Sequence, residues 1–207
     1  MKFTSALKLS LLSLFSLFFI FQAEAKEAAK PKAVPAPTVK TETATFAAGC
    51  FWGVEQFFRQ VPGVTDAKVG YAGGTKKDPK YEDVSEGTTG HAESVEIQFD
   101  PQKISYEKIL DLFFKMHDPT TKNRQGNDKG TQYRSAIFYH GDVQKKTAED
   151  FITKVGKSKA WKDPIVTEVV AAPVFYTAEE YHQKYLIKNP GGYDNHYVRK
   201  ISFDTAK

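Results

Sequence analysis

A single cysteine, Cys50, is the residue of this 207-residue chain with the clearest capacity for covalent chemistry. The small and β-branched residues 43–48 before it predict a short strand. After it, four apolar residues at helical spacing predict a helix: Val54, Phe57, Phe58 and Val61. Cys50 is therefore expected in the first turn of that helix, where unpaired backbone N–H groups and the helix dipole stabilise an anion. This placement predicts a thiol with a lowered pKa, and hence a nucleophile near neutral pH.

The alternative for a lone cysteine is a small apolar residue buried in the core. The predicted helix start and two bulky neighbours favour chemistry instead. Phe51 and Trp52 follow the cysteine directly and could line a small apolar pocket beside its sulfur.

A carboxyl group, that of Glu93, is the second candidate for chemistry. Residues 91–99 alternate as a strand does, and Glu93 falls on the same face as Val95, Ile97 and Phe99. Burial would raise the pKa of this carboxyl and make it a candidate general acid. The alternative is a carboxylate at the frayed end of the strand, leaning into water.

Two long polar segments, 72–90 and 120–130, are predicted to be loops, and loops of that length usually carry function. Tyr81 lies in the first of them. Asp128 and Tyr133 lie at or just before the start of the next predicted strand.

The chain has five histidines, and none has other candidate ligands at the spacing of a metal site, so no metal is predicted. They are His91, His117, His140, His182 and His196. A Cys–His hydrolase stays open, because pairing in space cannot be read from sequence. His182 is predicted to lie at the surface of a helix.

The order of predicted elements indicates the fold class. The first six read β-α-β-β-α-β, which is the split-βαβ, ferredoxin-like order, and a helix, a strand and a helix follow. We therefore expect an α+β protein, a two-layer sandwich with a mixed sheet. The last helix is predicted over 177–188 from a capping box of Thr177 and Glu180, and the helix before it is predicted to bury Val143.

Residues 1–25 have the features of a secretory signal peptide. The start is basic at Lys2 and Lys8, residues 9–21 form an apolar run, and 23–25 are a small-x-small cleavage site. The apolar run is short for a membrane span, which disfavours the alternative of an uncleaved anchor. We expect an exported protein, periplasmic or secreted, that has no membrane contact after cleavage.

The mature chain is predicted to form one domain. Residues 26–42 are rich in Lys, Ala and Pro and are expected to be a disordered linker, followed by a catalytic domain over 43–207. The net charge of +4 is spread through the sequence without a basic stripe, so nucleic acid is not an expected partner. We expect a monomer.

Several motifs, taken together and in order, resemble those of the peptide methionine sulfoxide reductase A family. They span about residues 43–193 and comprise Gly49-Cys50-Phe51-Trp52-Gly53 and the segments 70–74, 81–84, 87–93, 126–135 and 181–190. The resemblance implies reduction of the S epimer of methionine sulfoxide, free or in oxidised proteins. It makes Cys50 the nucleophile that attacks the sulfoxide sulfur and becomes a sulfenic acid. It makes Glu93 the acid that protonates or hydrogen-bonds the sulfoxide oxygen.

The resemblance also assigns roles to the residues around this pair. Phe51 and Trp52 would hold the substrate methyl group. Tyr81 and Tyr133 would hydrogen-bond the sulfoxide oxygen, and Asp128 would help to order the site.

The chain departs from many members of that family in having no second cysteine. Ser85 and Asp194 occupy positions at which some members carry a resolving cysteine. We therefore expect no prosthetic cofactor and an external thiol as reductant: thioredoxin, a glutaredoxin-like protein or a small thiol. Two rival functions are a Cys–His hydrolase or acyltransferase, and a secreted binding module in which Cys50 is merely buried.

Overall fold

The computed structural model of the protein describes residues 40–204, so the predicted signal peptide and most of the predicted linker lie outside the described residues. The main strands are β1 (Glu42–Ala48), β2 (Val64–Ala72), β3 (Ala92–Phe99), β6 (Ser135–Tyr139), β7 (Glu168–Ala171) and β8 (Tyr176–Thr177). The helices are α1 (Phe51–Arg59), α2 (Tyr81–Ser85), α3 (Tyr106–Met116), α4 (Asp142–Ser158) and α5 (Tyr185–Lys188). A small hairpin of β4 (Arg124–Gln125) and β5 (Asp128–Lys129) precedes a 3-10 turn, η1 (Thr131–Tyr133). Within residues 40–204, no helix has the length and apolarity needed to cross a membrane.

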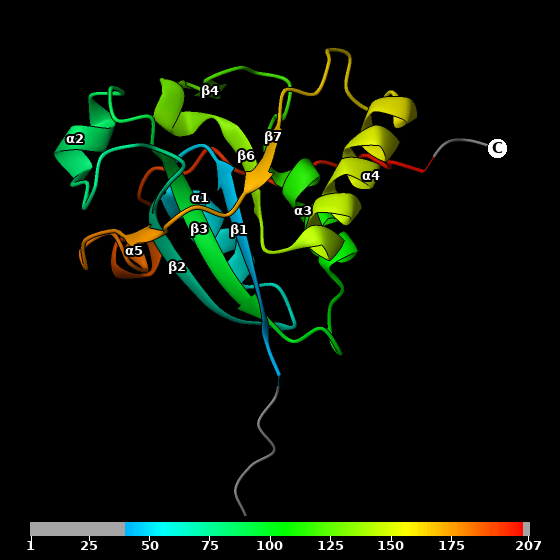
Figure 1. Ribbon diagram of the computed structural model, residues 1–207, viewed down its shortest axis with the longest axis horizontal. Helices are drawn as coiled ribbons and strands as arrows, with labels where there is room; N and C mark the ends of the chain where they lie inside the picture. The colour runs from blue at the N-terminus through cyan, green and yellow to red at the C-terminus, as the bar shows by residue number, and fades with distance from the viewer. Residues whose placement is uncertain (1–39, 205–207) are drawn as a thin grey trace, which may run out of the picture. The chain divides into compact units, whose positions relative to one another are not determined.

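The main sheet has the strand order β7-β6-β1-β3-β2-β8 (Figure 1). Its four central strands pair antiparallel in the order expected of a split βαβ fold, and β7 joins β6 in parallel. The predicted α+β class, ferredoxin-like core and mixed sheet are confirmed. Because β3 pairs with both β1 and β2, residues at the same end of these three strands lie side by side.

One face of the sheet carries α1 and α3, whose apolar stripes supply the core. The Phe46 ring of β1 stacks on Phe58 of α1 at 5.5 Å between centroids and on Phe113 of α3 at 5.0 Å. Helix α4 packs beside α3, where Phe151 stacks on Phe114 at 5.8 Å. This layer fixes α1 against the sheet, and with it the residue that begins α1.

The segment that joins β7 to β8 crosses the opposite face of the sheet (Figure 1). Small residues on this face form a second cluster with Phe138, against which Ala172 and Phe175 of the crossing segment pack. Gly70 of β2 allows the close approach, since a Cβ there would overlap the ring of Phe175. The crossing segment therefore joins the two edges of the sheet.

Several predicted details are wrong, and each has a local reason. The helix predicted over 177–188 is reduced to α5, because Thr177 pairs with β2 and Lys184 adopts a left-handed φ of 55°. Val143 is 81% exposed, because it lies on the outer side of α4. The polar segments predicted as loops contain α2 and the β4–β5 hairpin.

Shortening Phe113 to alanine is expected to lower the free energy of unfolding by about 3–5 kcal/mol. The ring is fully buried between Phe46 and Phe114, so its removal leaves a cavity that the sheet and helix can fill only in part. Urea denaturation measures the change, with Val143→Ala as the control expected within about 0.5 kcal/mol of the parent. A loss below about 1 kcal/mol for Phe113→Ala would show that the core does not depend on this ring.

Candidate active site

Cys50 lies at the junction of β1 and α1, where the chain turns from the sheet into the helix. It is the residue that caps the N-terminus of α1, so the predicted placement is confirmed. Gly49 before it adopts φ of +97°, and a Cβ there would lie 2.5 Å from Cβ of Gln125. The turn therefore requires glycine, and it leaves the Cys50 side chain 8% exposed.

The pKa of the Cys50 thiol is raised, which contradicts the lowered value predicted for it. Burial is the largest cause, and the nearby charge of Glu93 adds to it. The backbone N–H of Trp52 lowers the pKa, as a helix N-terminus should, but its effect is smaller than that of burial. The resting site therefore favours a protonated thiol.

Glu93 faces the core from β3, opposite Tyr71 of β2, and is 3% exposed. The frayed-end alternative is therefore wrong. Its Oε2 accepts a hydrogen bond of 3.0 Å from the backbone N–H of Phe51, the residue next to Cys50. Burial raises the pKa of this carboxyl to about 8, against the lowering effect of that hydrogen bond. Near neutral pH the group is thus an acid that can donate a proton.

The two aromatics after Cys50 lie in different surroundings. Phe51 is buried, with its ring 5.9 Å from that of Tyr71. Trp52 is partly exposed and stacks on Tyr185 of α5 at 3.8 Å, and its Nε1 donates to Nδ1 of His182 at 3.0 Å. His182 is 2% exposed, so its predicted surface placement is wrong.

Two phenols lie near Glu93. Tyr81 begins α2, and its backbone N–H donates to Glu179 at 3.1 Å. Tyr133 ends η1. Burial raises the pKa of both phenols, and the charge of Glu93 raises them further. Both phenols therefore stay protonated and can donate hydrogen bonds near the Glu93 carboxyl.

Asp128 on β5 is joined to the C-terminal tail, residues 193–204, by two side chains. Its Oδ1 accepts from the Tyr193 hydroxyl at 3.1 Å, and its Oδ2 accepts from Nδ2 of Asn195 at 3.0 Å. The charge of Asp128 raises the pKa of both Cys50 and Glu93, which places it beside them. The structure thus brings Asp128 to the same site as the other predicted residues.

Glu179 and the tail residues Tyr193 and Asn195 also belong to this region, although no sequence pattern predicted it. Glu179 accepts from the Tyr71 hydroxyl at 2.9 Å as well as from Tyr81. Asp194 lies near enough to Cys50 to raise its pKa. In the tail, the family resemblance had singled out Asp194 alone; the polar and aromatic residues around it have no period that predicts their place.

Each of the five histidines, all in the described part of the chain, hydrogen-bonds a group other than the Cys50 thiol. Their partners are Gly74 and Lys76 for His91, Phe113 and Ser135 for His117, Thr45 for His140, Trp52 for His182, and Ala48 and Asp194 for His196. This geometry does not support a Cys–His hydrolase. Among residues 40–204, no group of three Cys, His, Asp or Glu side chains is placed to share a metal ion.

Comparison with known proteins gives the family. The sequence profile described as peptide methionine sulfoxide reductase matches residues 42–206. The chain belongs to this family. A relative from Methanothermobacter thermautotrophicus, named peptide methionine sulfoxide reductase MsrA, is 56% identical over 149 residues, which are 72% of this chain and 88% of the relative. The chain is accordingly an oxidoreductase that reduces methionine sulfoxide.

Solved structures of the family agree with this fold. The crystal structure of Mxr1 from Saccharomyces cerevisiae in reduced form matches with a TM-score of 0.74 and 39% identity, over 82% of this chain and 98% of the yeast chain. The same yeast protein in complex with Trx2 matches with a TM-score of 0.54 and 29% identity, over 82% and 97% of the two chains.

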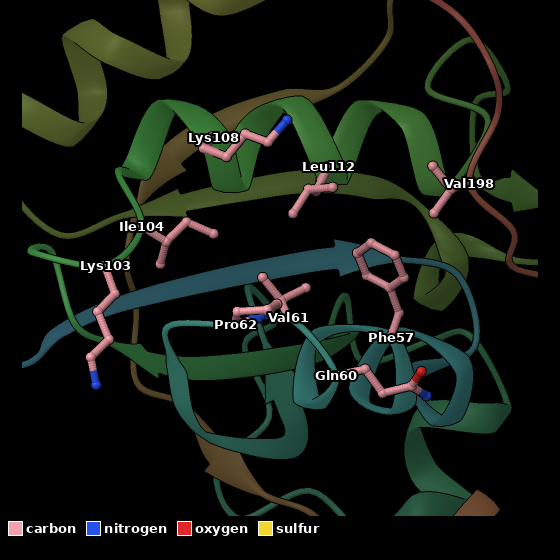
Figure 2. A pocket seen from close by; sticks show the side chains of 9 residues that line it. All are labelled: Phe57, Gln60, Val61, Pro62, Lys103, Ile104, Lys108, Leu112 and Val198. Atoms are coloured by element: carbon pink, nitrogen blue, oxygen red, sulfur yellow. The ribbon is translucent and has the colours of Figure 1, made fainter.

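An apolar groove of about 560 Å³ lies elsewhere on this methionine sulfoxide reductase fold. Figure 2 shows Phe57 of α1 and Val61 facing Leu112 of α3, with Val198 of the tail at one end. No cysteine, carboxylate or tyrosine lines this groove. It shares no residue with the site around Cys50 and has no group that could carry out the family's reaction.

Proposed function

We propose that this enzyme reduces the S epimer of methionine sulfoxide, free or in oxidised proteins, with Cys50 as nucleophile and Glu93 as acid. The observation that carries the proposal is the 3.0 Å hydrogen bond from the Phe51 N–H to Glu93 Oε2, since it fixes the acid one residue from the nucleophile. The second carboxyl oxygen is left to carry the proton. Phe51 and Trp52 are proposed to contact the substrate methyl group.

In the proposed reaction, the Cys50 sulfur forms a bond to the sulfoxide sulfur while Glu93 gives its proton to the sulfoxide oxygen. The phenols of Tyr81 and Tyr133 donate hydrogen bonds to that oxygen as its S–O bond breaks. The proton lost by the Cys50 thiol replaces the one that Glu93 gave up. The oxygen leaves as hydroxide and attacks the Cys50 sulfur, and the bond between the two sulfur atoms breaks with its electron pair going to the methionine sulfur. The products are methionine and the sulfenic acid of Cys50.

An external thiol is proposed to complete the cycle, because the chain has one cysteine and can form no internal disulfide. A first thiol attacks the sulfenic acid, forms a mixed disulfide with Cys50 and releases water. A second thiol attacks that disulfide and restores the Cys50 thiol. The yeast relative solved with Trx2 supports a thioredoxin-like protein as one source of these thiols.

The proposed compartment is outside the cytoplasm, in a periplasm or beyond the cell. The support is the basic, apolar and small-residue order of residues 1–25. In such a compartment, a solitary thiol requires a reductant that is present there.

The proposed function is tested by giving the purified enzyme each sulfoxide epimer separately, first without reductant. We expect one methionine per enzyme from the S epimer, none from the R epimer, and one sulfenic acid trapped by a dimedone-type reagent. Dithiothreitol, a glutaredoxin and a thioredoxin are then added in parallel reactions. Turnover of the R epimer, or of neither epimer by folded enzyme, would refute the proposal.

Tyr81→Phe is expected to lower turnover roughly tenfold to a hundredfold, because one hydrogen bond to the developing charge on oxygen is lost. The rate is measured at saturating S epimer. The matched control is Tyr106→Phe on α3, whose buried hydroxyl has no partner within residues 40–204, and it should keep turnover within about twofold. Equal rates in both variants would remove Tyr81 from the proposed oxygen site.

A further inference from the structure

One side chain of the C-terminal tail, His196, bonds to the end of β1 and is itself bonded to Asp194. Asp194 Oδ1 accepts from the backbone N–H of His196 at 2.9 Å and lies 3.0 Å from its ring Nδ1. The other ring nitrogen, Nε2, lies 2.7 Å from the carbonyl oxygen of Ala48. Both neighbours are hydrogen-bond acceptors, so the ring is held between the Asp194 carboxylate and the Ala48 carbonyl.

The Asp194–His196 pair also packs closely against the first turn of α1. A Cβ at Gly53 would overlap the Asp194 carboxylate and the His196 ring. A Cβ at Gly49 would lie 3.5 Å from the His196 ring, with Gln125 on its other side. The stretch from Ala48 to Gly53 is therefore enclosed by the pair, and Cys50 lies in the middle of that stretch.

His196 is held in place by burial of its ring and by backbone hydrogen bonds between the following residues and α3. Its side chain is 2% exposed. Beyond it, the backbone N–H of Tyr197 donates to the Met116 carbonyl at 3.3 Å, and that of Arg199 to the Lys115 carbonyl at 3.0 Å. The pairing of β1 with β3 ends at Phe46, whereas β6 pairs with β1 as far as Ala48. Ala48 is therefore the last paired residue before Cys50, and His196 binds its carbonyl at the point where both strand neighbours of β1 have ended.

We propose that His196, oriented by Asp194, is a positioning residue for Cys50. By bonding the Ala48 carbonyl, His196 fixes the turn through Gly49 and so sets the orientation of the Cys50 side chain. This inference rests on the proposed function, because the orientation of the Cys50 sulfur affects the rate only if that sulfur attacks a bound substrate. A displacement of the sulfur by roughly 1 Å can lower the rate about a hundredfold. Asp194 occupies a position that the family resemblance gives to a resolving cysteine in other members. In this chain the tail supplies alignment there in place of a second thiol.

The test compares His196→Ala, His196→Gln and His140→Ala in the full enzyme. His140 is the matched control, since its Nε2 lies 2.9 Å from the Thr45 hydroxyl and so bonds the same strand farther from Cys50. We expect His196→Ala to lower the single-turnover rate by about tenfold to a hundredfold with KM changed less than about threefold. His196→Gln, whose amide can still donate to the Ala48 carbonyl, should restore most of the rate, and His140→Ala should match the parent.

Two outcomes overturn the positioning role: an unchanged rate in His196→Ala, or equal loss in His196→Ala and His196→Gln. The rate of Cys50 alkylation by iodoacetamide separates this inference from the proposed function. We expect it to rise at least about fivefold in His196→Ala, because the turn is freed. If the parent enzyme reduced neither epimer, the proposed function would fail and alkylation alone would decide: an unchanged alkylation rate overturns the role.

Discussion

Replacing Cys50 by serine is expected to abolish methionine formation, with a loss of at least about 10⁴-fold. A serine side chain has no sulfur that could attack the sulfoxide and become the proposed sulfenic acid, and the chain has no other cysteine to replace it. Chromatography of methionine after incubation with the S epimer and dithiothreitol measures the effect. The similar size of the two side chains means that thermal unfolding should change little.

The parent enzyme provides the control for Cys50→Ser. After reaction with one equivalent of the S epimer it should take up one dimedone-type label, whereas the variant should take up none. Methionine formation by Cys50→Ser within tenfold of the parent rate would contradict the role of the thiol. It would point to reduction by a group that lies outside the site around Cys50.

Replacing Glu93 by glutamine is expected to lower turnover by roughly 10²- to 10⁴-fold, because an amide keeps the shape of the side chain but gives no proton. The glutamine oxygen can still accept from the Phe51 N–H, so the turn after Cys50 should be kept. The matched control is Glu96→Gln, on the opposite face of the same strand, expected within about twofold of the parent. Equal rates for the two variants would exclude Glu93 as the acid.

The pH dependence of turnover gives an independent check on Glu93. Its carboxyl has a pKa raised to about 8 by burial, so the protonated, active form prevails below that pH. Turnover should therefore fall as the pH rises through about 8 in the parent, and Glu93→Gln should lack this decline.

The raised pKa of Glu93 also makes the folded protein less stable at high pH than at low pH. The folded pKa of about 8 exceeds the ordinary value of 4.5, so the unfolded chain releases this proton first. The contribution of Glu93 to stability is therefore full below pH 4.5 and is lost as the pH rises through about 8. At pH 9, Glu93→Gln should be more stable than the parent in urea, while being far less active.

The period of two in a strand placed Glu93 on the same face as three apolar neighbours, but it left open whether the carboxylate leans into water at the frayed end of the strand. Its burial in the fold decides between the two. The start of α1 at Cys50 could be predicted from the helical period of its apolar residues. The face of Glu93 and the start of α1 follow from local spacing, as does the order of the six elements that gave the ferredoxin-like core.

The features that could not be predicted depend on contacts between distant parts of the chain. The pKa of Cys50 follows from burial by the whole fold, which outweighs the local effect of the helix start. Thr177 resembles a helix cap, but it pairs with Gly70 of β2 instead. His182 meets Trp52 across 130 positions of sequence, and His196 meets Ala48 across 148. No periodic pattern encodes such pairs.

The places of the proposed nucleophile, just after β1, and of the proposed acid, on β3, also bear on local unfolding of the protein. Cys50 follows β1 and Glu93 belongs to β3, which is paired on both sides, whereas Tyr81 and Asp128 come from short elements in polar connections. Local opening should therefore release the second pair of residues without separating the first. The amide proton of Phe51, bonded to Glu93, should exchange with deuterium at the rate of global unfolding, so the reacting pair would persist for as long as the sheet does.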